Sequence, residues 1–198
     1  MTPENSQLDK GFLGKWIWVT GIAWPVGIIV SIIVAHIVNI VYPKETNLVV
    51  GLCVGAVVGY SQWSVLKKQA QISSFWGLAC SIGMGVPFMV VVILDEVGVE
   101  VPDSTNVESL GRIVIGVIGG LLSGLLQVRV LRNHYAKAWW WMLVSAAGWG
   151  LCWLACSIGA PWVAVIGFFS GGIILGLVTG LGLLWIQENS LQREQDTF

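Results

Sequence analysis

Two glutamines and one arginine are the residues in the apolar part of this chain that are best suited to chemistry. Gln62 and Gln127 each stand four residues before a leucine that a basic residue follows, and Arg129 comes two residues after Gln127. In lipid, a glutamine gains about 1–2 kcal/mol from a hydrogen bond to another helix, so we interpret both as clips between helices. Contact with a bound headgroup or cofactor is the alternative. Arg129 has no evident carboxylate partner in the sequence and is where we look first for function.

A histidine is the next candidate. His36 lies toward the outer end of the first apolar stretch, where an imidazole could bind a tetrapyrrole or carry protons. A proton relay needs further acidic or imidazole groups, and the other histidine, His134, falls in a turn between apolar stretches. We therefore interpret His36 as a hydrogen-bonded structural residue.

Metal and enzyme chemistry have little support. Cys152 and Cys156 stand one helical turn apart, but no histidine or further cysteine accompanies them at ligand spacing, so we predict no metal site. The sequence contains no H-E-x-x-H, G-x-S-x-G or P-loop motif and no paired intramembrane aspartates. We predict a protein that is not an enzyme and has no cofactor, with lipid as a possible ligand and a pigment or quinone as the less favoured one.

The composition places these residues in a membrane. Mean hydropathy is +0.80 and charged residues make up 11% of the chain, against about 25% in soluble domains. Six apolar stretches are long enough to cross about 30 Å of hydrocarbon. They cover residues 15–41, 47–66, 73–94, 111–131, 138–157 and 162–186. Their length favours helices over barrel strands, so we predict an all-α fold: a single domain, 1–198, of six transmembrane helices.

The distribution of basic residues predicts the orientation. Eight of the ten lysines and arginines fall on the side of the two termini, which the positive-inside rule makes cytoplasmic. Residues 95–110 are then an acidic, non-cytoplasmic loop and 188–198 a polar cytoplasmic tail. The expected location is a bacterial inner membrane, and the basic residues expected to contact lipid headgroups are Lys67, Lys68, Arg132 and Lys137. A flanking belt of this kind gives no support to nucleic-acid binding.

An internal repeat predicts the architecture. A shift of 65 positions matches the second and third apolar stretches to the fourth and fifth, with Gln62 on Gln127 and Trp76 on Trp141. The sixth stretch has the same four-residue glycine spacing as the second and fourth, although Leu183 stands where a glutamine is expected. Pairing of the sixth stretch with the first would then close three similar hairpins into a ring with approximate threefold symmetry.

The glycines of the even-numbered stretches form ladders on one helix face, which lets two helices approach closely in lipid. The ladders comprise Gly51, Gly55 and Gly59; Gly116, Gly120 and Gly124; and Gly172, Gly176 and Gly180. We interpret this glycine-zipper pattern as packing within one chain. A homo-oligomer interface, or the lining of a site for a flat ligand, is the alternative.

Twelve tryptophans are far more than a chain of this length normally carries. Eight of them map near the cytoplasmic interface and predict an aromatic girdle: Trp16, Trp18, Trp63, Trp76, Trp139, Trp140, Trp141 and Trp185. Trp24, Trp149, Trp153 and Trp162 lie deeper or toward the far side. We expect these four to pack against neighbouring helices, with a flat ligand as the alternative.

The segment from Gly59 through Gln62-Trp63 to Leu66-Lys67, and its echo from Gly124 to Trp149, resemble a group of small polytopic bacterial membrane proteins. That group has repeated Q-W-x-x-L-[KR] and W-W…G-W segments; here Val128 stands where the pattern has tryptophan. The resemblance covers most of the chain. It implies a fold but no activity.

These observations favour an accessory or scaffold subunit that packs against membrane lipids and either a membrane-protein partner or copies of itself. A small channel or transporter with a path between the hairpins is the first alternative, since transporters often carry internal repeats. A pigment- or quinone-binding subunit is the second.

Overall fold

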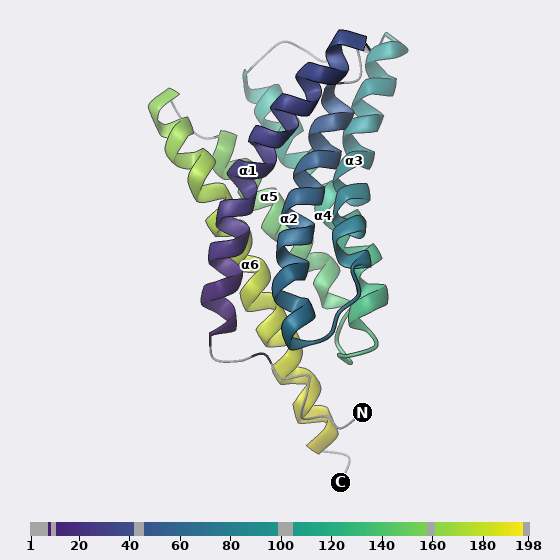
Figure 1. Cartoon of the computed structure of the whole chain (residues 1–198), viewed down its shortest axis with the longest axis vertical. Helices are drawn as coiled ribbons and strands as arrows, with labels where there is room; N and C mark the ends of the chain where they lie inside the picture. The colour runs from purple at the N-terminus through teal and green to yellow at the C-terminus, as the bar shows by residue number, and fades with distance from the viewer. Residues whose placement is uncertain (1–7, 9–10, 42–45, 99–104, 158–160, 196–198) are drawn as a thin grey trace.

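The computed structural model describes residue 8 and residues 11–41, 46–98, 105–157 and 161–195, and over these residues the chain is helical and without strands (Figure 1). The six helices are α1 (Phe12–Val41), α2 (Thr46–Gln69), α3 (Phe75–Glu96), α4 (Thr105–Leu131), α5 (Trp140–Ser157) and α6 (Pro161–Gln195). Each is long and apolar enough to cross a membrane. The predicted all-α fold of six such helices is therefore confirmed.

Two helices extend beyond the stretches that hydropathy marked. α4 begins at Thr105, within the segment 95–110 expected as a loop, and α6 continues to Gln195, through most of the expected tail. Polar residues outside the hydrocarbon remain compatible with a helix because water can solvate their side chains, so a helix does not have to end where its apolar part ends. The hydropathy pattern marks the membrane-spanning part of each helix and not its ends.

The helices form a closed ring. Each packs against its neighbours in the chain, and α1 also packs against α6. α1 begins and α6 ends at the same end of the bundle, where the α2–α3 and α4–α5 turns also lie (Figure 1). The pairing of α6 with α1 is the contact that the glycine pattern predicts. The approximate threefold relation between the pairs stays a prediction.

Close approach between helices occurs along the glycine ladders. A Cβ atom on the middle glycine of each ladder would meet the backbone of the partner helix at 2.5–2.9 Å, closer than real Cβ atoms come. These contacts join Gly55 to the Cys80 carbonyl oxygen, Gly120 to the Ser145 carbonyl oxygen and Gly176 to Ile17 Cα. The outer glycines, Gly51, Gly59, Gly116, Gly124, Gly172 and Gly180, lie against the same three partners, α3, α5 and α1. All nine face a helix of their own chain, as the intrachain interpretation expects.

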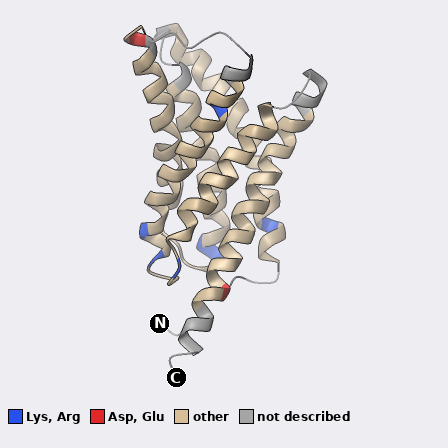
Figure 2. Cartoon of the chain, turned by 180° about the vertical axis from the view of Figure 1, so that it is seen from behind, with Lys and Arg blue, Asp and Glu red and all other residues tan. Residues whose placement is uncertain are grey.

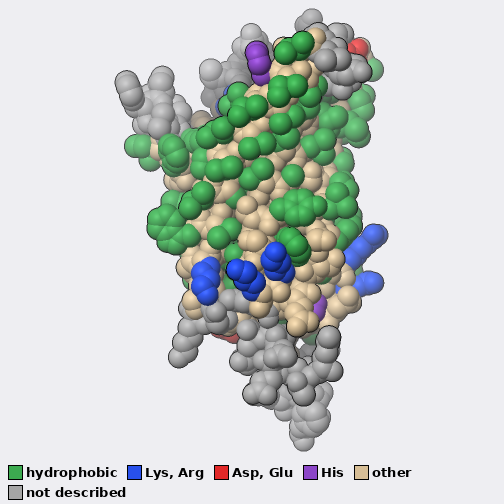
Figure 3. Space-filling model, viewed as in Figure 1, with side chains coloured by type: hydrophobic (Ala, Val, Ile, Leu, Met, Phe, Trp, Pro, Cys, Tyr) green, Lys and Arg blue, Asp and Glu red, His purple; other side chains and the backbone are tan. Residues whose placement is uncertain are grey.

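The surface divides into an apolar band and a basic rim. Large aliphatic side chains are exposed along all six helices, as a lipid-facing surface requires. A row of lysines and arginines lies below this band (Figure 3), and most of the basic residues gather at the end where α1 begins and α6 ends (Figure 2). We call this the basic end and the opposite one the far end.

We expect Gly120→Ala to lower the free energy of unfolding by about 1–3 kcal/mol, because its methyl group would push α4 away from the Ser145 carbonyl. Thermal unfolding in detergent measures the change. Gly111→Ala, on the same helix, is the matched control, since its Cβ would meet nothing within 4 Å. That variant should be neutral or gain up to about 1 kcal/mol from helix propensity. Equal effects at both positions would contradict close packing along the ladder.

Candidate functional site: a belt of indole and amide groups

The two glutamines predicted as clips accept hydrogen bonds from tryptophans of the neighbouring helix. Trp76 Nε1 of α3 donates to Gln62 Oε1 of α2 at 3.3 Å, and Trp141 Nε1 of α5 donates to Gln127 Oε1 of α4 at 2.8 Å. Both glutamines are buried, with 3% and 2% of their surface exposed. The 65-residue repeat thus extends to the hydrogen bond itself.

The α6–α1 pair has an equivalent hydrogen bond with a different acceptor. Trp16 Nε1 donates to Thr179 Oγ1 at 2.9 Å, and the Thr179 hydroxyl donates to the Leu175 carbonyl at 2.5 Å. Leu183, where the repeat predicts a glutamine, is fully buried and apolar. The comparison between the internal repeats missed this acceptor, because Thr179 stands one helical turn before Leu183 on the same face of α6. A search for any hydroxyl one turn from the expected glutamine would have found it.

The glutamine amides extend these pairs around the ring. Gln62 Nε2 lies 3.5 Å from Thr20 Oγ1 of α1, and Gln127 Nε2 donates to the Trp76 carbonyl of α3 at 3.3 Å. Each glutamine therefore connects the two odd-numbered helices that flank its own. Thr20 was not singled out from the sequence, because a lone threonine in an apolar stretch carries no motif. Since both glutamine oxygens and both amide nitrogens have partners within the chain, the geometry favours a clip over a ligand contact.

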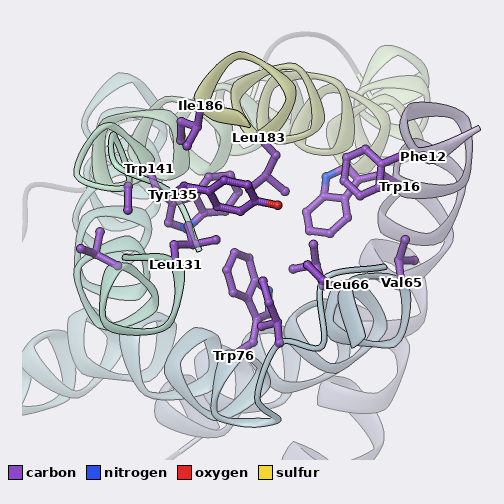
Figure 4. Packing of buried hydrophobic residues seen from close by; sticks show 14 residues of the cluster. Phe12, Trp16, Val65, Leu66, Trp76, Leu131, Tyr135, Trp141, Leu183 and Ile186 are labelled. Atoms are coloured by element: carbon purple, nitrogen blue, oxygen red, sulfur yellow. The ribbon is translucent and has the colours of Figure 1, made fainter. Parts of the chain in front are cut away.

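The hydrogen-bonded side chains form a belt around the ring: Trp16, Gln62, Trp76, Gln127, Trp141 and Thr179. The three tryptophans of this belt fill the centre of the ring. Figure 4 shows Trp16, Trp76 and Trp141 pointing inward from three sides. The ring centroids of Trp16 and Trp76 are 6.4 Å apart, and those of Trp76 and Trp141 are 5.2 Å apart. All three side chains are at most 1% exposed. Space wide enough for water therefore does not border them, and the ring is closed at this level.

The girdle interpretation is wrong for these three tryptophans. They lie near the basic end as predicted, but on the inner face, where an amide or hydroxyl accepts each indole N–H. Trp18, Trp139, Trp140 and Trp185 do lie on the outer surface, with Trp18 72% exposed. The sequence predicts how far each tryptophan lies from the membrane interface. It does not predict whether the side chain faces the lipid or the interior of the ring, because both are apolar.

Aromatic and aliphatic side chains close the basic end of the ring. Phe12, Leu131, Tyr135 and Ile186 are buried in the same cluster as the three tryptophans (Figure 4). Burial raises the pKa of Tyr135, in the α4–α5 turn, to about 12. The phenol is therefore neutral at physiological pH and suits an apolar cap.

A second aromatic layer lies toward the far end. Trp24 of α1 packs against Trp149 and Trp153 of α5 with ring centroids 5.9 and 5.4 Å apart, and Phe88 of α3 lies 6.2 Å from Trp153. They also contact neighbouring helices, as the sequence predicts: Trp24 lies against Gly172 of α6, and Trp149 and Trp153 lie against Gly116 of α4. The side chain of Trp162 lies outside the described residues.

The charged candidates lie outside the belt. Arg129, Arg132, Lys67 and Lys68 are exposed, and His36 is exposed near the far end of α1. Arg129 follows Gln127 in sequence but points to the outer surface of α4, so the structure gives it no contact with the glutamine belt. Arg129, which the sequence favours for function, is therefore not part of this site.

Two lysines are held at the basic rim by aromatic rings. Lys67 Nζ lies 4.3 Å from the centroid of the Trp63 ring, and Lys137 Nζ lies 5.5 Å from that of Trp185 while donating to Asn189 Oδ1 at 3.0 Å. Such cation–π contacts fix a charge beside an aromatic surface. They place ammonium groups where phospholipid headgroups are expected.

The described residues contain no group of three or more histidine, cysteine, aspartate or glutamate side chains able to hold a metal ion. Cys53, Cys80, Cys152 and Cys156 are free thiols. Cys156 Sγ donates to the Gly167 carbonyl at 3.7 Å. The cysteine pair singled out from the sequence therefore has no third side-chain ligand in the described part of the chain.

Comparisons with protein-family models, with curated proteins and with solved structures returned no match. The function must therefore be inferred from the chain's own residues and geometry.

We expect Gln127→Leu to destabilise the protein by about 1–3 kcal/mol, because it leaves the Trp141 indole N–H buried without an acceptor. Adding Trp141→Phe removes that donor. The double variant should therefore lose at least about 1 kcal/mol less than the sum of the two single variants. Unfolding in detergent measures all four states of this cycle.

The control cycle pairs Gln127→Leu with Trp139→Phe, since Trp139 is exposed and has no hydrogen bond to Gln127. Its two effects should add. Additivity in both cycles would contradict a role for the Gln127–Trp141 hydrogen bond in stability.

Proposed function

We propose that the protein is a non-enzymatic scaffold or accessory subunit of a membrane, which acts through its outer surface on lipids and on a membrane-protein partner or further copies of itself. The observation that supports this proposal is the occupation of the ring by its own side chains. Gln62, Gln127 and Thr179 all have their acceptor oxygens engaged by indoles of the same chain. Polar groups that are paired within the chain stabilise the fold, and few of them remain available for chemistry at the belt.

The closed belt favours a scaffold over a channel. A channel needs a continuous polar path, and five hydroxyl side chains near the middle of the helices donate to helix carbonyls instead. Ser31, Ser81, Ser123 and Ser170 do so at 2.7–3.4 Å, and Thr179 does the same. The buried layer of Trp16, Trp76 and Trp141 then blocks the axis.

The proposed environment is a bacterial inner membrane with both termini in the cytoplasm. Support comes from the charge asymmetry: most of the basic residues of the described chain gather at the end where α1 begins and α6 ends (Figure 2). Exposed tryptophans lie at the same end, as do Lys67 and Lys137, whose ammonium groups contact indole rings. An anionic inner leaflet attracts such a rim by about 1 kcal/mol for each basic residue.

Extraction in a mild detergent should recover the protein with a specific membrane protein or as a homo-oligomer, because the exposed apolar band is the surface through which a scaffold acts. Light scattering coupled to size exclusion, with mass spectrometry of the eluted complex, is the measurement. A monomer that carries nothing in several mild detergents would contradict the scaffold role.

Liposomes that contain the wild-type protein should show no more proton or potassium flux than protein-free liposomes, because the tryptophan layer closes the ring. The matched sample is Trp18→Phe, a change on the outer surface that should leave the flux at the same background. Flux in the wild type that a gradient drives would favour the channel alternative.

A further inference from the structure

Two buried indole donors near the far end have no oxygen or nitrogen acceptor. The Nε1 atoms of Trp24 and Trp153 are buried, and no oxygen or nitrogen atom of the described residues accepts a hydrogen bond from either. In the belt, by contrast, the indoles of Trp16, Trp76 and Trp141 all donate to a side-chain oxygen. A buried N–H that has lost water and gained no partner is costly, and such groups are rare in native structures. Two of them side by side call for a specific explanation.

The two donors belong to side chains that meet inside the ring. Trp24 comes from α1 and Trp153 from α5, and their rings pack edge to face with centroids 5.4 Å apart. Trp153 also contacts Phe88 of α3. Because α1, α3 and α5 are not neighbours in the ring, these contacts cross its interior. The unpaired donors therefore share one aromatic site.

Burial decreases toward the far end of this site. Trp24, Met84 and Trp149, at equivalent positions on the odd-numbered helices, are buried. One turn further out, Ile28, Phe88 and Trp153 are only half-buried. The site thus has a closed floor and a more open rim, the reverse of the basic end, where Tyr135 and its neighbours close the ring.

The described part of the chain offers only weak acceptors here. The sulfur of Cys156 lies beside Trp24, and a thiol sulfur accepts hydrogen bonds weakly. The surrounding cluster holds two further thiols, Cys80 and Cys152, and otherwise aromatic and aliphatic side chains such as Val54, Val58 and Leu175. A ligand with oxygen acceptors and an uncharged, apolar body would complement this lining.

We propose that the aromatic site formed by Trp24, Trp153 and Phe88 opens, by movement of its half-buried members Trp153 and Phe88, to bind a membrane-soluble molecule through a carbonyl oxygen, which accepts hydrogen bonds from the two indoles. The carbonyl belongs either to the ring of a quinone or to the ester of a lipid, and the aromatic walls pack against its apolar body. This binding goes beyond the proposed scaffold role and does not depend on it.

The test uses the full chain purified in dodecyl maltoside, a detergent without carbonyl groups. Two probes are titrated separately: a benzoquinone with a decyl chain, and dioctanoyl phosphatidylglycerol. The thermal midpoint is followed for the wild type, Trp24→Phe, Trp153→Phe, the double variant and Trp18→Phe. Phenylalanine keeps an aromatic ring and removes the N–H, and Trp18 is the matched exposed control.

We expect at least one probe to raise the midpoint of the wild type and of Trp18→Phe in a saturable manner. Each single variant at the site should weaken the apparent affinity about fivefold, the worth of one neutral hydrogen bond, and the double variant should weaken it further. A response to the quinone alone identifies a quinone ring, and a response to the phospholipid alone identifies a lipid ester. A response to both shows that the carbonyl itself is recognised.

The probe-free midpoints separate this proposal from a buried water or a bond to Cys156. Without ligand the unpaired N–H groups do not stabilise the fold. Their removal should therefore leave the thermal midpoint unchanged or raise it, once the effect of the smaller phenylalanine side chain is taken into account. Three results would overturn the proposal: no shift with either probe in the wild type, equal affinity in the wild type and the double variant, or probe-free destabilisation that Cys156→Ala abolishes. None of them bears on the partner and oligomer measurements that test the scaffold role.

Discussion

The close approach of even- and odd-numbered helices along the glycine ladders is the contact on which the rest of the structure depends. Without side chains at Gly55, Gly120 and Gly176, the backbones of each pair nearly touch. In lipid there is little hydrophobic drive between helices, so packing of this kind supplies much of their association. It also sets the short distance over which a tryptophan of one helix reaches a glutamine or threonine of the next.

The absence of water in the hydrocarbon then governs the belt. An amide or indole that faces the ring must find its partner within the protein, and the chain supplies one for Gln62, Gln127 and Trp16. The same rule makes the far half of the ring unusual, because Trp24 and Trp153 bury donors that the described chain does not pair. The proposed scaffold role and the proposed carbonyl site are compatible, since the first uses the outer surface and the second the interior of the ring.

Much of the belt could be predicted from sequence. Gln62 and Gln127 were identified as helix clips because they recur at matched positions, and the structure pairs each with a tryptophan of the same repeat. Thr179 escaped because the third repeat moves its acceptor by one turn. Arg129 is a basic residue at the position where the first copy has Ser64, yet it lies on the outer surface. A break in a repeat therefore marked a change in surface charge and not a functional residue of the belt.

Hydropathy, the 65-residue repeat and the glycine spacing of the sixth stretch were sufficient to predict six membrane helices and the pairing of the sixth with the first. Both depend on residue type and spacing, which folding does not alter. Tertiary packing alone decided which face of each helix is inside, and so separated Trp16, Trp76 and Trp141 from the exposed Trp18, Trp139 and Trp140. In a soluble protein polarity would have divided these faces. In a membrane, lipid and protein core are equally apolar, so only the contacts between helices distinguish them.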